Sequence, residues 1–258
     1  MRTRQVVLLC GLVLLLGQSV SASTITWNAP ENITGASNVQ TGNILEAYIF
    51  GNSSVTATTI NGVTFSPFDV SLASSITVGN VTLSTSGGDG IVGTAGLNTF
   101  GSGSAPFADL PLAYQSLLGT AAYTNCNSCT APLDVELSGL TIGGTYEVEV
   151  WVNDSRSDPG SYRNETLSGA PPPTLDFNTT GDGGVGQYVI GTFTAGATTE
   201  SFAILGTDSY DPNSASQING LEVLATPEPS TLALLGLGAL ALAFAFRGKR
   251  QSGPARSA

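Results

Sequence analysis

The sequence predicts an all-β protein, a single antiparallel β-sandwich of the jelly-roll type, and three observations support this prediction. Apolar and polar residues alternate with a period of two in many short segments, as in strands with one buried face. Turn-forming residues separate these segments, and Gly, Ser, Thr and Asn are abundant. The stretch between the two chain ends, about 200 residues, is long enough for one domain with a good core.

Two hairpins are predicted in the first half of the chain. The segment 58–65 is centred on Asn61 and Gly62, a pair that tolerates the positive φ of a tight hairpin turn. The segment 75–84 is centred on a Gly-Asn pair with the same property.

One helix is predicted, over residues 111–118. Asp109 lies near its start as a candidate cap, and Pro111 suits a first helical turn. Two stretches, the Gly- and Ser-rich 87–106 and the Pro-containing 155–173, are expected to be long loops, which in compact domains are uncommon unless they are functional or disordered.

The second half is rich in predicted strands. In 133–137, Asp134 and Glu136 alternate with apolar residues. A Gly-Gly turn follows, and in 146–152 every second residue is again apolar. The remaining predicted strands are 187–194, 201–205 and 217–224.

The polar face of the strand 146–152 is a candidate glycan-binding platform, formed by Glu147, Glu149 and Trp151. Aromatic rings stack on sugar faces, and carboxylates accept hydrogen bonds from sugar hydroxyls. The alternative is that Trp151 packs under a loop or against a second sheet. Glu147 and Glu149, about 7 Å apart along the strand, could also act as a glycosidase pair. Because exposed acids are ordinary on a sheet surface, no enzyme activity is expected.

Charge excludes one class of partner. Residues 23–226 contain two basic side chains, Arg156 and Arg163, against 18 acidic ones, which gives a net charge of −16. Nucleic-acid binding needs basic surface and is therefore excluded. An acidic domain suits divalent cations, although turn chemistry explains its loop acids equally well. The weak candidate ligands for a structural calcium ion are Asp154, Asp158, Asp208 and Asp211.

The first 22 residues have the three-part layout of a secretory signal peptide. Arg2 and Arg4 precede the apolar run 6–16, and small residues follow, with Val20 and Ala22 placed before a cleavage site. The apolar run is too short to span a bilayer comfortably. We therefore expect export by Sec-type machinery and removal of residues 1–22 after Ala22.

A second apolar run occupies residues 230–246 and contains no charge. As a helix it would rise about 25 Å, a little less than a hydrocarbon core of roughly 30 Å. The basic residues after it should remain cytoplasmic, together with the tail 251–258. We therefore expect a precursor anchored in the inner membrane, with residues 23–226 outside the cytoplasm. The basic residues in question are Arg247, Lys249 and Arg250.

Residues 227–250 begin with Pro227, Glu228 and Pro229, and the apolar run and the basic cluster follow in that order. This arrangement resembles the PEP-CTERM sorting signal of exported bacterial proteins. The resemblance implies recognition by an exosortase, which would cut near 227–229 and release the ectodomain or transfer it to the cell surface. It also implies a host that makes exopolysaccharide.

Three further stretches, 140–154, 186–193 and 218–223, resemble strands of galactose-binding-like β-sandwich modules. This resemblance implies binding at loops or on one concave face. The expected protein is thus a surface or matrix protein with a non-catalytic, polysaccharide-associated binding or structural module. The alternatives are a calcium-stiffened adhesin or surface-coat protein without sugar specificity, and a carbohydrate-active enzyme.

The chain has no histidine, which excludes His-dependent triads and His-ligated zinc. Cys126 and Cys129 are the thiols that remain after removal of the signal peptide. In an oxidising compartment we expect them to form a local disulfide, and a redox pair is the alternative. The disulfide would close a very small loop and add little to global stability.

Overall fold

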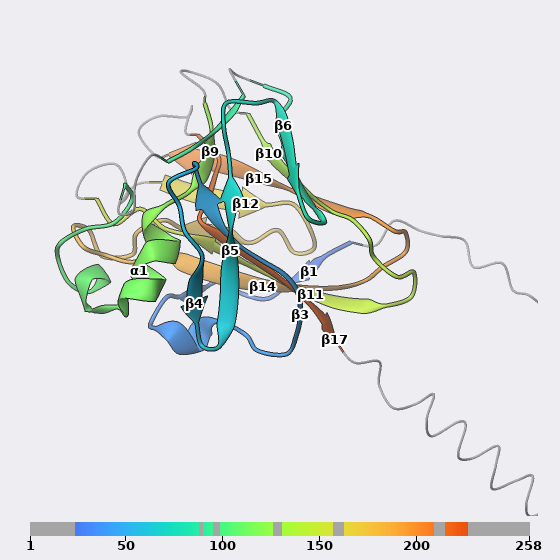
Figure 1. Cartoon of the computed structure of the whole chain (residues 1–258), viewed down its shortest axis with the longest axis horizontal. Helices are drawn as coiled ribbons and strands as arrows, with labels where there is room; N and C mark the ends of the chain where they lie inside the picture. Colours follow the sequence, from blue (N-terminus) through green and yellow to red (C-terminus); the bar gives the residue numbers. More distant parts are fainter. Residues whose placement is uncertain are drawn as a thin grey trace, which may run out of the picture.

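The structure is a computed structural model, and it describes residues 24–87, 90–94, 99–125, 131–156, 163–208 and 215–226. Within these ranges the chain is nearly all β, with its strands in three sheets (Figure 1). The helical elements are η1 (Ala36–Asn38), η2 (Phe107–Asp109) and α1 (Leu112–Gly119).

The large sheet holds eight strands. They are β1 (Thr26–Trp27), β2 (Glu31–Asn32), β3 (Asn43–Gly51), β4 (Thr58–Ile60), β5 (Val63–Asp69), β11 (Thr145–Val152), β14 (Gln187–Thr194) and β17 (Gly220–Thr226). Their order is β1-β14-β11-β17-β3-β5-β4, and β2 also pairs with β14. The neighbours are antiparallel except β3 and β5, which are parallel.

The second sheet holds six strands, all antiparallel to their neighbours, in the order β13-β12-β15-β10-β7-β6. They are β6 (Ser75–Val78), β7 (Val81–Ser84), β10 (Leu133–Leu137), β12 (Arg163–Leu167), β13 (Thr174–Asp176) and β15 (Glu200–Asp208). A small third sheet has the order β16-β9-β8. Its strands are β8 (Ile91–Gly93), β9 (Ala122–Thr124) and β16 (Gln217–Ile218).

The main core lies between the large and second sheets. It contains Val148 and Val150 from β11 together with Leu83 and Val135 from the facing strands, all completely buried. These residues are the apolar faces of period-two patterns, so they meet because alternation puts every second side chain on the same side of a strand. The prediction of a nearly all-β fold with packed sheets is confirmed, whereas the parallel pair β3 and β5 and the small third sheet were not predicted.

A second buried cluster covers the outer face of the large sheet. Trp151 on β11 packs there with Phe65 on β5 and with Tyr114 and Leu117 of α1. The strand β11 is therefore buried on both faces along much of its length. The second cluster therefore covers the face of β11 that was predicted to be polar.

Local turn chemistry agrees with the sequence. Asn61 and Gly62 have φ values of 50° and 83° between β4 and β5, and Gly79 has φ 57° between β6 and β7. The helix is also confirmed, as α1. Asp109 is not its cap: Pro111 occupies the N-cap position, and no side chain makes a capping hydrogen bond.

The two stretches predicted as long loops each contain a strand. The stretch 87–106 includes β8 and the stretch 155–173 includes β12. The signal in β12 is weak because its buried positions are Glu165 and Leu167, so only one of the two is apolar. Periodicity of apolar residues cannot detect a strand whose inward face is half polar.

Several predictions fall outside the described residues. They are the signal peptide 1–22 with its cleavage after Ala22, the sorting signal 227–250 with its helix 230–246, the tail 251–258, the Cys126 and Cys129 pair, and the calcium candidates Asp158 and Asp211. Among the helices of the described ranges, none has the length and apolar character needed to cross a membrane.

Candidate functional site

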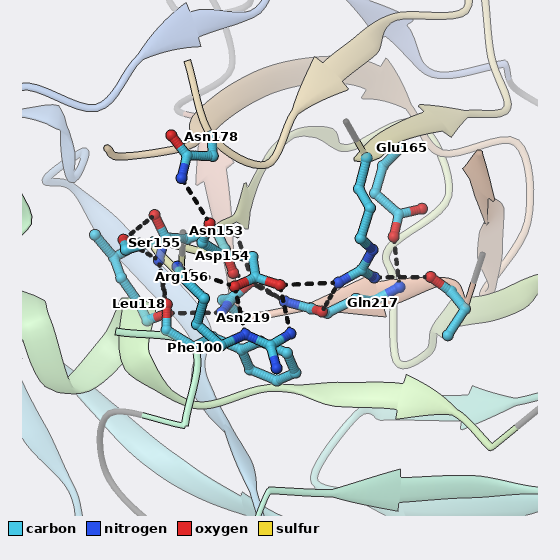
Figure 2. Close-up of polar contacts among 12 residues, drawn as sticks. Phe100, Leu118, Asn153, Asp154, Ser155, Arg156, Glu165, Asn178, Gln217 and Asn219 are labelled. Carbon is cyan, nitrogen blue, oxygen red and sulfur yellow. Dashed lines mark hydrogen bonds and ion pairs between the residues drawn. The ribbon is translucent and has the colours of Figure 1, made fainter. Parts of the chain in front are cut away.

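A buried polar network lies where β11 ends (Figure 2). The three residues that follow Val152 are Asn153, Asp154 and Ser155, and all are completely buried. Burying polar groups is unfavourable unless they are hydrogen-bonded. The contacts of these residues therefore show what holds this end of the sandwich together.

Asn153 is hydrogen-bonded on every side. Its Nδ2 donates to the carbonyls of Phe100 and Leu118, both at 3.2 Å, and its Oδ1 accepts from the backbone N–H of Gly186 at 2.8 Å. Its own backbone N–H donates to Asn219 Oδ1 at 2.8 Å. One side chain thus joins β11 to the end of α1 and to two neighbouring loops.

Asn219 and Gln217 extend the network into β16 and β17. Asn219 Nδ2 donates to the carbonyls of Leu118 and Thr120, both at 2.8 Å. Gln217 Nε2 donates to the carbonyl of Asn153 at 2.9 Å and to Asn219 Oδ1 at 3.1 Å. Both side chains are completely buried, so they form a fixed base under the loops at this end.

Asp154 binds two arginines. Arg156 Nε and Nη2 donate to its two oxygens at 2.7 and 2.6 Å, and Arg163 Nη1 donates at 3.2 Å. Each guanidinium also lies over an aromatic ring, Arg156 over Phe100 and Arg163 over Phe177. The hydrogen bond to Asp154 raises the pKa of Arg156, against the opposing effect of burial. These contacts hold both guanidinium groups in place.

Glu165 lies beside Arg163 inside the network. Its Oε1 accepts from the backbone N–H of Gln217 at 2.6 Å, while its Oε2 has no partner among the described residues. Complete burial raises the pKa of Glu165 well above its ordinary value, although the charge of Arg163 opposes that shift.

A cavity of about 250 Å³ opens above this network. Its lining includes Phe100, Tyr123, Arg156, Arg163 and Gln217. The Arg156 side chain is 39% exposed, and no hydrogen bond within the described part of the chain uses its Nη1. The cavity therefore offers a fixed guanidinium edge beside the rings of Phe100 and Tyr123. These rings pack edge to face, with their centroids 6.1 Å apart. We call it the loop-end cavity.

A second buried acidic site lies on the outer face of the large sheet. Glu149 and Glu222 are direct partners in the register of β11 and β17, and both are completely buried. The backbone N–H of Gln40 donates to Glu149 Oε2 at 3.2 Å, and the other three carboxylate oxygens have no hydrogen-bond partner within the described ranges. Burial, aided by neighbouring carboxylates, raises the pKa of Glu149 to about 9 and that of Glu222 to about 8.

The prediction of a glycan platform around Trp151 is corrected by burial. Glu147, Glu149 and Trp151 do share one face, but Trp151 is completely buried. Its Nε1 donates to Tyr114 Oη at 3.0 Å, and Phe65 packs edge to face on its ring. The ring has no free face for a sugar, because α1 and the β4–β5 hairpin cover it.

Asp154 is not available as a calcium ligand, because its carboxylate is already paired with two guanidinium groups. Asp208 ends β15, where its backbone pairs with that of Arg163. Across the described ranges, no group of three or more Cys, Asp or Glu side chains is placed to hold a metal ion. A structural calcium ion elsewhere stays a prediction.

Sequence reasoning missed most of the loop-end residues. It named Asp154 only as a weak calcium candidate, and Arg156 and Arg163 only as the two basic side chains between residues 23 and 226. Phe100 lies inside a Gly- and Ser-rich stretch, and Gln217 and Asn219 lie among apolar strand residues. The available signal was the run Asn153-Asp154-Ser155 directly after an apolar strand. Polar side chains that continue a buried strand need hydrogen-bond partners if they are buried as well.

Comparison with known proteins supports the assignment of the C-terminus. The PEP-CTERM protein-sorting motif matches residues 225–250. This match implies an exported protein that is sorted by an exosortase. No curated protein matches the chain.

Among solved structures, the chain is similar to the ANXUR1 extracellular domain from Arabidopsis thaliana, with 13% identity and a TM-score of 0.44, covering 79% of this chain and 54% of that one. The ANX2 ectodomain from Arabidopsis thaliana matches with 14% identity and a TM-score of 0.41, covering 72% and 52%. The chain spans about half the length of these ectodomains.

Proposed function

We propose that the exported domain is a non-catalytic module that binds extracellular polysaccharide through the loop-end cavity. The observation that carries the proposal is the composition of that cavity, in which Phe100 and Tyr123 lie beside the guanidinium groups of Arg156 and Arg163. Sugars are bound by aromatic rings together with a few fixed polar groups. The cavity offers both kinds of contact.

Pre-organisation also favours binding at this place. The guanidinium of Arg156 is held by Asp154, and Asp154 is in turn held by Asn178, whose Nδ2 donates to the Asp154 carbonyl at 3.0 Å. A side chain that is already fixed loses little entropy when a ligand binds. The network therefore holds Arg156 Nη1 in a position from which it can donate a hydrogen bond to a sugar oxygen.

The same residues support the non-catalytic part of the proposal. The described residues that line the cavity carry no carboxyl side chain, whereas glycoside hydrolysis commonly needs a pair of acids at the bond that is cut. Glu149, one member of the predicted pair, is completely buried away from this cavity. In the proposed life cycle, the precursor is anchored in the inner membrane and an exosortase then delivers the domain to the cell surface or matrix.

The test is binding to a microarray of neutral and acidic bacterial polysaccharides. The wild-type protein should bind, and Tyr123→Ala and Arg156→Gln should each reduce affinity at least about tenfold, as expected for loss of a central contact. Glu136→Gln, an exposed change on β10, is the matched control and should bind as the wild type does. A wild-type protein that binds no polysaccharide, or a Tyr123→Ala variant that binds unchanged, would contradict the proposal.

A further inference from the structure

The last strand of the domain runs directly into the sorting motif. The strand β17 lies between β11 and β3 in the large sheet and ends at Thr226, whose Oγ1 donates to the carbonyl of Thr145 at 3.0 Å. The motif match begins at residue 225. The motif and a central strand thus overlap by residues 225 and 226, so no linker separates the folded domain from the sorting signal.

This continuity limits how far the domain can be from a membrane. Three residues, 227–229, separate β17 from the apolar run 230–246. Fully extended, three residues span at most about 11 Å. If the run spans the bilayer, as the proposed anchored precursor requires, the end of the sandwich at Thr226 lies close to the lipid surface.

The same end carries two exposed apolar side chains. Ile142 is 60% exposed in the turn before β11, and Leu45 is 45% exposed on β3, two residues beyond Asn43, the partner of Ala225. The turn of Ile142 is held firmly, because the backbone N–H of Gly143 donates to the carbonyl of Ala195 at 2.8 Å. Ile142 is thus presented on a fixed turn. We call this surface the anchor-proximal end.

A hollow of about 120 Å³ lies at this end, lined in part by Leu45, Leu140 and Val223. Its acidic group, Glu46, is already used, since Tyr48 Oη donates to one carboxylate oxygen at 2.6 Å and the backbone N–H of Asn80 to the other at 3.1 Å. The hollow therefore adds apolar surface next to Leu45.

Charge distinguishes the two ends of the domain. The basic side chains of the described chain, Arg156 and Arg163, both lie at the loop-end cavity, beyond the far end of β11. The eight residues of β11 separate the ends by about 26 Å. A contact at the anchor-proximal end must therefore be apolar, without attraction to anionic headgroups.

We propose that Leu45 and Ile142 rest on the lipid bilayer in the anchored precursor, so that the loop-end cavity points away from the membrane. This inference rests on the proposed anchoring of the precursor. Fully burying one such side chain contributes only about 1.5–3 kcal/mol. Contact therefore depends on attachment of the domain to the membrane-spanning run, which raises the effective concentration of the lipid surface even through a flexible linker of about 12 residues.

The test uses the full chain reconstituted in phosphatidylcholine vesicles whose acyl chains are brominated and quench nearby tryptophan. The variants are Ile142→Trp and, as a matched control, Leu112→Trp. Leu112 lies on α1 and is 80% exposed. Figure 1 shows α1 on the side of the domain opposite to the end of β17. The native Trp27 and Trp151 are buried and supply a constant background. We expect the emission that Ile142→Trp adds above this background to fall roughly twofold, as for a side chain at the interface, and the emission that Leu112→Trp adds to be unchanged.

A second variant separates docking from mere proximity. A flexible Gly/Ser segment of about 12 residues between 226 and 227 allows the domain to move tens of ångströms from the membrane. Quenching of Ile142→Trp that persists with this insertion supports docking. Quenching that is absent, equal in the two tryptophan variants, or lost with the insertion overturns it. Flotation of the chain with the vesicles tests anchoring independently, and the polysaccharide array tests the proposed binding.

Discussion

The two buried acidic sites of the domain are neutralised in opposite ways. At the loop end, the carboxylate of Asp154 is paired with the guanidinium groups of Arg156 and Arg163. On the outer face of the large sheet, Glu149 and Glu222 face each other, and three of their four oxygens have no partner in the part of the chain that the structure describes. At the first site two guanidinium groups compensate the carboxylate; the second becomes neutral by binding protons, as its raised pKa values indicate.

The difference shows where this chain uses its few basic residues. Both arginines of residues 23–226 lie at the loop-end cavity, although a buried acidic pair elsewhere would also be stabilised by a cation. A pair that binds protons needs no cation but becomes sensitive to pH, whereas the charged site is sensitive to the loss of either partner. Each site therefore has its own characteristic test.

The largest expected effect is at the loop end. Asp154→Ala should lower the free energy of unfolding by about 3–5 kcal/mol, because it leaves two guanidinium groups without their counter-ion. Urea denaturation of the purified protein measures this change. The control is Asp109→Ala, at an exposed residue, which should change stability by less than about 0.5 kcal/mol. Equal stabilities of the two variants would show that the Asp154 pair is not structural.

A second expected effect is a dependence of stability on pH that originates in Glu149 and Glu222. A carboxyl whose pKa is raised on folding stabilises fully below its unfolded pKa, near 4.5, and this contribution is lost as pH rises through the folded values of about 8 and about 9. The wild-type protein should therefore become less stable as the pH rises from 5 to 9.

Glu222→Gln should flatten this loss, because an amide keeps the shape of the neutral acid and does not titrate. Denaturation curves between pH 5 and pH 9 measure the slope. Glu136→Gln, at an exposed position of β10, should leave the wild-type slope unchanged. Parallel curves for Glu222→Gln and the wild type would mean that the pair is ionised in the folded protein at neutral pH.

The smallest expected effect separates the outer face of the large sheet from the binding site. Trp151→Phe removes the indole N–H that donates a hydrogen bond to Tyr114 Oη, and both side chains are completely buried. The free energy of unfolding should fall by about 1–2 kcal/mol, while binding to the polysaccharide array stays unchanged. A loss of binding with unchanged stability would restore Trp151 as a sugar contact.

Much of the fold could be predicted because its signals are local. The alternation in β11 and the Asn61-Gly62 turn each depend on a few neighbouring residues, and both are found as predicted. The strand β12 could not be predicted, because Glu165 occupies a buried position and only its tertiary partners make that tolerable. Trp151 was placed on the correct face, yet α1 and the β4–β5 hairpin cover that face.

The candidate site was the least predictable part. Asp154, Arg156 and Arg163 were noticed as polar residues, but the carboxylate was interpreted as a calcium ligand rather than as their ion-pair partner. Phe100 and Gln217 come from segments 53 and 64 positions away from Asn153, whose amide and carbonyl they contact. Such long-range hydrogen bonds leave no periodic pattern in the sequence.

The sequence by itself determined the strand pattern, the tight turns and the sorting motif, because these depend on residues that are neighbours along the chain. Only the tertiary structure decided which polar residues are buried and with whom they pair. In the folded protein, the polar face of β11 lies in a second buried cluster, and two arginines and two aromatic rings line one cavity. The physical reason is that burial and ion pairing depend on what folding brings from distant segments.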